Sequence, residues 1–193
     1  IKEQRDALSF GLAIYGMRKE NVIFRDSGYN NVSNGETEHR GVELEVSYSL
    51  TDNLQMSLNG TYAEHKYANN PALLKDGDGN LVPIDGNDVD SAPRGFGSVR
   101  ALWKPSPQGR LELEWVRMGS YYLEPRNAYR YAGHNLFNVR GSWDLKPNVT
   151  VYVRLLNATD RDYAKRADYT SFTDERYFPG TPRSFGLGVD YVW

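Results

Sequence analysis

Hydrophobic and polar residues alternate along most of the chain with a period of two, which is the spacing of β-strands that have one apolar and one polar face. The final segment shows the pattern clearly, with small or polar residues between the apolar ones. Its apolar positions are Phe185, Leu187, Val189, Tyr191 and Trp193. We therefore predict a terminal strand whose apolar face ends on an aromatic residue.

The same alternation recurs in about eight segments. Their apolar positions fall within residues 8–24, 42–50, 54–62, 99–103, 111–115, 137–143, 149–155 and 185–193. A slip of one residue would turn each apolar set toward the opposite face, so the register of each strand is strongly specified. This recurrence predicts an all-β fold, an antiparallel transmembrane β-barrel whose apolar phase faces lipid.

The connections between these segments alternate in length. Short turns rich in turn-forming residues lie at 51–53, 106–109 and 146–148. Long polar stretches lie near 26–39, 66–95, 122–134 and 157–182. Short turns at one end and long loops at the other are typical of outer-membrane barrels, so we expect the short turns on the periplasmic side and the loops outside the cell.

Aromatic residues of the apolar phase gather close to the short turns. They are Tyr48, Trp103, Trp143, Tyr191 and Trp193. Because amphipathic aromatic rings are enriched at membrane–water interfaces, these residues predict a periplasmic aromatic girdle.

The opposite phase of the strands is polar and charged, which predicts a wide, wet or plugged lumen rather than a narrow dry one. If the turn at 106–109 closes a hairpin, Arg100 faces Glu114, a cross-strand pair worth roughly 0.2–1 kcal/mol. Arg140 and Arg154 also come close together, which is unfavourable unless an acid such as Glu112, or a plug, lies between them.

Bulk composition does not reveal this pattern. Charged residues make up 25% of the 193 residues, and the mean hydropathy is -0.66. Alternating strands give such averages even when half of their side chains contact lipid. The net charge of -2 gives no indication of the basic surface that binds nucleic acid. The lack of cysteine excludes disulfides, thiolate metal sites and a cysteine nucleophile.

One of the long loops concentrates aromatic and arginine side chains. Its candidate ligand-binding residues are Tyr122, Arg126, Tyr129, Arg130, Tyr131 and His134. Stacking and bidentate hydrogen bonds from such residues suit an anionic, catecholate-like or carboxylate-bearing ligand. In the alternative interpretation, Tyr121 and Tyr122 belong to an upper girdle, and the arginines pair with lipopolysaccharide phosphates or loop acids. The 157–182 loop has a similar composition, and we expect its role to be mainly structural.

Other candidate chemistry is weak. Asp76, Asp78 and Asn80 alternate as in a Ca²⁺ loop, but Leu81 stands at the required glycine position, so we interpret the segment as a polar turn. His39, His65 and His134 lie in or beside three different loops without ligand spacing. No residue set supplies an activated nucleophile or a tuned acid and base. We therefore assign no catalytic residue, metal or cofactor, and predict that the protein is not an enzyme.

Several motifs resemble one family. In the first hairpin they are Asn21-Val-Ile-Phe24 and Arg40-Gly-Val-Glu-Leu-Glu45, and Ala92-Pro-Arg94 precedes a later strand. The strongest match is Leu156-Asn-Ala-Thr-Asp-Arg-Asp-Tyr163 followed by Tyr177-Phe-Pro-Gly-Thr-Pro-Arg-Ser184. In this order, together with the aromatic-terminated strand, they resemble the TonB-dependent outer-membrane receptors.

The resemblance implies a 22-stranded barrel with an N-terminal plug, located in the outer membrane of a Gram-negative bacterium. Such a receptor imports a scarce nutrient, most often a ferric siderophore or another iron complex. The chain has no initiator Met or signal peptide, and we expect residues 1–193 to be the C-terminal barrel segment, with about eight of the strands. The implied partners are membrane lipid and lipopolysaccharide, a siderophore-like ligand, the barrel-assembly machinery through the terminal strand, and TonB through a region upstream.

Three other protein classes compete with this interpretation. A self-contained eight-stranded outer-membrane protein with a structural or adhesive role has the right strand number, but the interior charge argues against it. An outer-membrane enzyme would need a catalytic constellation at the outer rim. A soluble eight-stranded barrel would turn its apolar phase inward and leave the aromatic ring at one height unexplained.

Overall fold

The computed structural model describes residues 2–5, 7–25 and 30–193. Its strands are β1 (Lys2–Arg5), β2 (Leu8–Arg25), β3 (Asn31–Thr51), β4 (Leu54–Tyr67), β5 (Gly95–Trp103), β6 (Gly109–Met118), β7 (Tyr121–Tyr122), β8 (Arg130–Tyr131), β9 (His134–Lys146), β10 (Val149–Leu156), β11 (Ala164–Thr170), β12 (Asp174–Pro179) and β13 (Ser184–Tyr191). Within these ranges, no helical segment has the length and apolarity needed to cross a bilayer.

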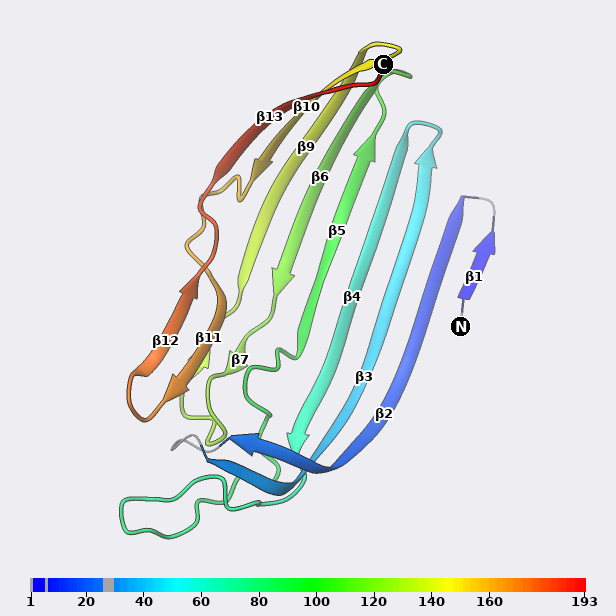
Figure 1. The fold of residues 1–193 in the computed structure, drawn as a ribbon. Coiled ribbons are helices and arrows are strands. Elements are labelled where there is room, and N and C mark those ends of the chain that lie inside the picture. The colour runs from blue at the N-terminus through cyan, green and yellow to red at the C-terminus, as the bar shows by residue number, and fades with distance from the viewer. Residues whose placement is uncertain (1, 6, 26–29) are drawn as a thin grey trace.

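Nine strands form one curved antiparallel wall, in the order β1-β2-β3-β4-β5-β6-β9-β10-β13 (Figure 1). The eight strands that the alternation predicts are all present, and the all-β antiparallel architecture is confirmed. The short strand β1, which the sequence pattern did not predict, pairs with the start of β2. Among the described residues, β1 and β13 do not pair with each other, so the wall is an open part of a barrel.

The register places the two phases on opposite faces of the wall. The charged pairs of the polar face form as expected: the Nε of Arg100 donates to Oε1 of Glu114 at 2.9 Å. Arg140 and Arg154 are direct cross-strand partners, and Arg140 donates to Glu112 at 2.6 Å. Glu112 therefore compensates Arg140 from the β6 side, and does not lie between the two arginines as the expectation had it.

The prediction of a loop near 26–39 is wrong for most of that range, because residues 31–39 belong to a strand. Strand β2 continues to Arg25 and β3 begins at Asn31, so the hairpin is longer than the strands around it. A strand needs about 9–11 residues to span a bilayer. Strands β2 and β3 have 18 and 21 residues, so their outer parts extend beyond the membrane-spanning length. Outside the hydrocarbon layer neither face of the hairpin contacts lipid, so its residues need not alternate, which explains why the pattern covers less than the whole hairpin. Residues 26–29 lie outside the described ranges.

The short turns lie together at one end of the wall and the other long loops at the opposite end (Figure 1). At the long-loop end, β7–β8 and β11–β12 form two small hairpin sheets that the sequence pattern did not predict. They pack on each other through a buried cluster of Tyr121, Leu123, Tyr131, Ala164 and Ala167. A second cluster, centred on Tyr67 and Ile84, holds the 68–94 loop against the β2–β3 hairpin.

The five residues of the predicted girdle all have exposed side chains, as a lipid-facing position requires. Trp103 and Trp143 lie next to the short turns, and Trp193 follows the end of β13. Their membrane role stays a prediction.

Candidate functional site

The long loops and the outer end of the β2–β3 hairpin surround a cleft of about 680 Å³. This size lies within the range of small-molecule sites. The cleft is lined by the basic residues Arg25, Lys75, Arg126, Arg166 and Arg176, the aromatic residues Phe24, Tyr67, Tyr129 and Tyr169, and the acidic residues Asp90, Glu124 and Asp168. Three loops therefore contribute charged groups to one cavity.

Glu124 positions the loop that carries Arg126. Its carboxylate accepts hydrogen bonds from the backbone N–H groups of Arg126 and Ala128, both at 2.6 Å. The Arg126 guanidinium donates to the backbone carbonyl of Lys75 at 3.0 Å, which joins two loops. Within the described ranges Arg126 makes no ion pair, so its positive charge is available to an anionic ligand.

Asp168 neutralises much of the charge of Arg166 and Arg176. It is 6% exposed, and both Arg166 and Arg176 approach its carboxylate oxygens at 2.6 Å. An ion pair of this kind holds both guanidinium groups in fixed positions at the cleft wall. A ligand carboxylate or phenolate entering there would share cations with Asp168.

The cleft also contains two stacked rings and a buried acid. The Tyr129 and Tyr169 rings stack at 4.4 Å between centroids with 10° between planes. The Tyr67 hydroxyl donates a 2.5 Å hydrogen bond to Asp90. Burial raises the pKa of the Asp90 carboxyl above its usual range. The site thus offers aromatic surface and cations, together with one acid that is poorly solvated.

The predicted ligand residues do not all meet in the cleft. Arg126 and Tyr129 line it. Tyr131 and His134 are buried below the loops, where the Tyr131 hydroxyl and His134 Nδ1 lie 2.8 Å apart. The guanidinium of Arg130 lies over the Tyr122 ring at 5.7 Å, and both residues line a separate hollow of about 160 Å³. Ligand contact by any of the six stays a prediction.

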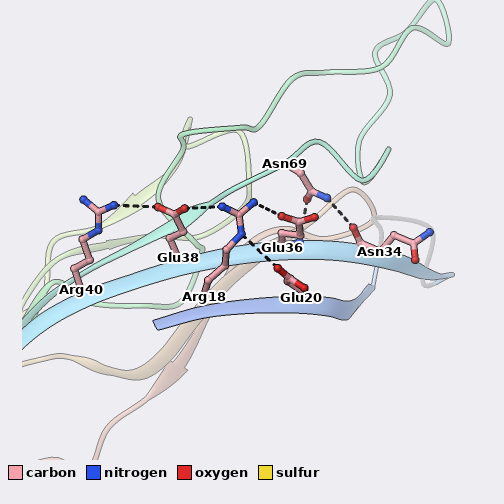
Figure 2. A network of polar contacts seen from close by, with 7 residues as sticks. All are labelled: Arg18, Glu20, Asn34, Glu36, Glu38, Arg40 and Asn69. Atoms are coloured by element: carbon pink, nitrogen blue, oxygen red, sulfur yellow. Dashed lines mark hydrogen bonds and ion pairs between the residues drawn. The ribbon is translucent and has the colours of Figure 1, made fainter. Parts of the chain in front are cut away.

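A row of polar side chains joins β2 to β3 in the long hairpin and joins the 68–94 loop to β3. Arg18 on β2 pairs with Glu36 and Glu38 on β3 at 2.5 and 3.0 Å (Figure 2). Asn69 accepts from the backbone N–H of Glu36 at 2.9 Å and donates to the carbonyl of Asn34 at 2.7 Å. Solvent-exposed ion pairs contribute little to stability, so the Asn69 bonds to the backbone matter more for holding the loop on the hairpin.

The segment with alternating acids, residues 76–80, forms a polar turn, as predicted. One carboxylate oxygen of Asp76 accepts from the backbone N–H groups of Asp78 and Asn80 at 2.9 and 2.8 Å. These hydrogen bonds, first of all that from Asn80, lower the pKa of Asp76. The carboxylate is therefore engaged in closing its own turn.

Sequence reasoning missed the contribution of Lys75, Arg166 and Arg176 to the cleft. Residues 75 and 126 are far apart in the sequence and meet only because the loops fold over one another. One partial signal was available, since the 157–182 loop shares the aromatic and arginine composition of the 121–134 loop.

Comparisons with known proteins agree with this architecture. Over residues 2–158 the chain matches the model of a family described as TonB dependent receptor-like, beta-barrel. No curated relative matches the sequence.

Solved structures match the fold over almost the whole chain. The siderophore receptor PiuA from Acinetobacter baumannii is 19% identical with a TM-score of 0.79, covering 96% of this chain and 26% of its own. The ferric yersiniabactin uptake receptor FyuA from Yersinia pestis is 16% identical with a TM-score of 0.80, covering 98% and 28%. The copper transporter OprC is 19% identical with a TM-score of 0.73, covering 98% and 29%. The chain thus spans between a quarter and a third of the length of each.

Proposed function

Because the chain belongs to the TonB-dependent receptor β-barrel family, we propose that it forms a wall and the extracellular loops of an outer-membrane importer. The imported nutrient is an anionic iron complex of the siderophore class. The observation that carries this proposal is the cleft, where Arg126, which makes no ion pair among the described residues, and the stacked rings of Tyr129 and Tyr169 line the same cavity.

The unpaired edges of the wall support the proposal that it is one part of a larger barrel. In the hydrocarbon region an unpaired strand edge leaves backbone donors and acceptors without partners, which lipid does not tolerate. Among the described residues the two outer strands of the wall do not pair with each other. We therefore assign residues 1–193 to the C-terminal segment of the barrel, with further strands and a plug supplied by the rest of the protein. Coupling to TonB would belong to that rest.

The chemistry of the cleft suits a ligand that carries phenolate or carboxylate groups. Arginine donates paired hydrogen bonds to such groups, and tyrosine rings stack on planar ones. The acids Asp90 and Asp168 oppose a highly charged anion, so the ligand's negative groups should lie near Arg126 rather than deep beside Asp90.

The test is a titration of the full-length receptor with a panel of ferric catecholate, hydroxamate and carboxylate complexes. We expect one class to bind, and Arg126→Gln to weaken its binding by about tenfold or more, since tenfold corresponds to about 1.4 kcal/mol. Arg130→Gln is the matched control, because Arg130 lies outside the cleft. Equal affinities of the parent protein and Arg126→Gln would remove the cleft from the binding site.

A further inference from the structure

His39 on β3 and His65 on β4 face each other across the wall. They are direct register partners, and their Nδ1 atoms lie 2.8 Å apart. Both side chains are on the polar face and partly exposed. The pair lies beyond Tyr62, where the pairing of β4 with β5 ends, and two residues short of Tyr67 at the cleft wall. It therefore belongs to the part of the wall that leads into the cleft.

The contact requires that at least one of the two Nδ1 atoms be unprotonated. A hydrogen bond between two Nδ1 atoms has one donor and one acceptor, so the acceptor ring presents a lone pair toward its partner. The Nε2 of His39 lies 2.8 Å from the Thr37 hydroxyl. Both contacts are satisfied when Nε2 of His39 carries its proton and Nδ1 is the acceptor. A ligating histidine is commonly oriented by such a bond at its other nitrogen.

The spacing of the two nitrogens matches neighbouring ligands on a square-planar ion. At a metal–nitrogen distance of about 2.0 Å, nitrogens 2.8 Å apart subtend about 90° at the metal. Tetrahedral ligands at the same distance would need nitrogens about 3.3 Å apart. Square-planar or tetragonal nitrogen sites favour Cu²⁺ or Ni²⁺, and Cu²⁺ has the higher affinity of the two.

A methionine lies in the same cross-strand row. Met17 on β2 is the register partner of His39, so its thioether belongs to the same face, and directly opposed residues have Cβ atoms about 4.5–5.5 Å apart. Two neighbouring charges act on the rings in opposite directions. Lys19 disfavours a positive charge on both imidazoles, whereas Asp88 favours one on His65.

We propose that His39 and His65 form a binding site for one Cu²⁺ ion on the polar face of the wall, with the two Nδ1 atoms as adjacent ligands. On loading, the Nδ1 proton of His65 moves through solvent to its Nε2, which leaves a neutral ring with a free Nδ1 lone pair, and the metal binds between the two Nδ1 atoms. This site is separate from the anion cleft, and its occupancy does not depend on which iron complex the cleft takes.

The experiment is a titration of the purified full-length receptor with CuCl₂ at pH 7.5, followed by calorimetry and electron paramagnetic resonance. We expect one tetragonal Cu²⁺ signal with coupling to nitrogen. His39→Gln and His65→Gln should each weaken that binding by at least about tenfold and reduce the nitrogen coupling. His134→Gln is the matched control, because His134 is the remaining histidine of the chain and lies in a different cluster.

Retained binding of the iron complex by His39→Gln and His65→Gln establishes that these variants are folded. Copper binding that is the same in the parent protein and both variants would overturn the proposal, as would a bound ion without nitrogen coupling. A failure of the cleft titration with intact copper binding would contradict the import proposal alone.

Discussion

At the residue scale, Glu114 joins three strands on the polar face of the wall. It is 7% exposed and accepts hydrogen bonds from Arg100 and Asn138, both at 2.9 Å. Arg140 approaches the same carboxylate at 2.9 Å. The carboxylate therefore compensates two guanidinium groups that would otherwise face each other across the sheet.

We expect Glu114→Gln to reduce the free energy of unfolding by about 1–3 kcal/mol, because the buried Glu114 carboxylate is the charged acceptor of two half-exposed guanidinium groups. Glu112→Gln is the matched control, since Glu112 is 29% exposed and, among the described residues, forms an ion pair only with Arg140. That change should cost less than about 1 kcal/mol. Denaturant unfolding of the full receptor in detergent measures both, and equal losses would contradict the special role of Glu114.

Asp90 gives a pH-dependent prediction. Because burial raises the folded-state pKa of Asp90, the folded protein binds this proton more tightly than the unfolded chain. The stabilisation is fully present below the usual value of 3.8 and is lost as the pH rises through the folded-state pKa. At neutral pH the ionised Asp90 carboxylate therefore lowers the stability of the folded state around it.

We expect Asp90→Asn to stabilise the 68–94 loop at pH 7 and to have no effect near pH 3.5, since asparagine can still accept the bond from Tyr67. Hydrogen exchange of the loop at the two pH values checks this. Weaker protection of the variant at pH 7 would show that the charge of Asp90 is needed.

At the element scale, the β2–β3 hairpin depends on irregular residues that its sequence supplies. Asn21 and Asn34 have φ of 56° and 63°, and the register shifts between Lys19 and Val22 and again before Phe24. The Phe24 ring then covers Gly35, where an added Cβ would lie 2.0 Å from ring carbon Cε2. These shifts turn Phe24 onto Tyr67, with ring centroids 5.4 Å apart.

Replacing Asn34 by Val should destabilise the hairpin by about 1–2 kcal/mol, because β-branched residues strongly disfavour the left-handed region. Asn34→Gly should be nearly neutral, since glycine adopts this conformation readily and the backbone carbonyl still accepts from Asn69. Hydrogen exchange of residues 31–40 distinguishes the two variants. Similar protection in both would show that φ at this position carries no strain.

The strands of the wall could be predicted from the sequence because alternation is a local property. The eight strands and the Arg100–Glu114 pair follow from it. The outer part of the hairpin could not be predicted, because outside the hydrocarbon layer no lipid-facing phase imposes alternation. The cleft could not either, because Lys75, Arg126 and Arg166 meet through loop packing. The His39–His65 pair was within reach, since a hairpin turning at residue 52 places residue 39 opposite residue 65.

At the scale of the whole molecule, the wall has an apolar outer face with its tryptophans at different heights. Trp103, Trp143 and Trp193 lie near the short-turn end, whereas Trp115 lies toward the other end of β6 and donates to Asn135 at 3.1 Å. In a membrane, the first three should lie at one interface.

Fluorescence quenching by lipids brominated at defined depths tests this arrangement in the full receptor. Each tryptophan is replaced in turn by Phe, and the loss of signal gives its own depth profile. We expect matching shallow profiles for Trp103, Trp143 and Trp193 and a different profile for Trp115. Profiles that place Trp103 and Trp143 at the bilayer centre would contradict the girdle.

The strand order has a consequence for the path by which the protein forms. Each strand of the wall pairs with strands that are its neighbours in the chain, apart from the small excursions of β7–β8 and β11–β12. The wall can therefore form one strand pair at a time, with short closures at the tight turns and longer ones across the segments that carry the long loops. The cleft instead requires the distant 68–94, 119–133 and 157–183 segments to dock after the strands below them exist. The binding surface should be the last region to become protected from proteases during folding and the first to lose that protection on heating.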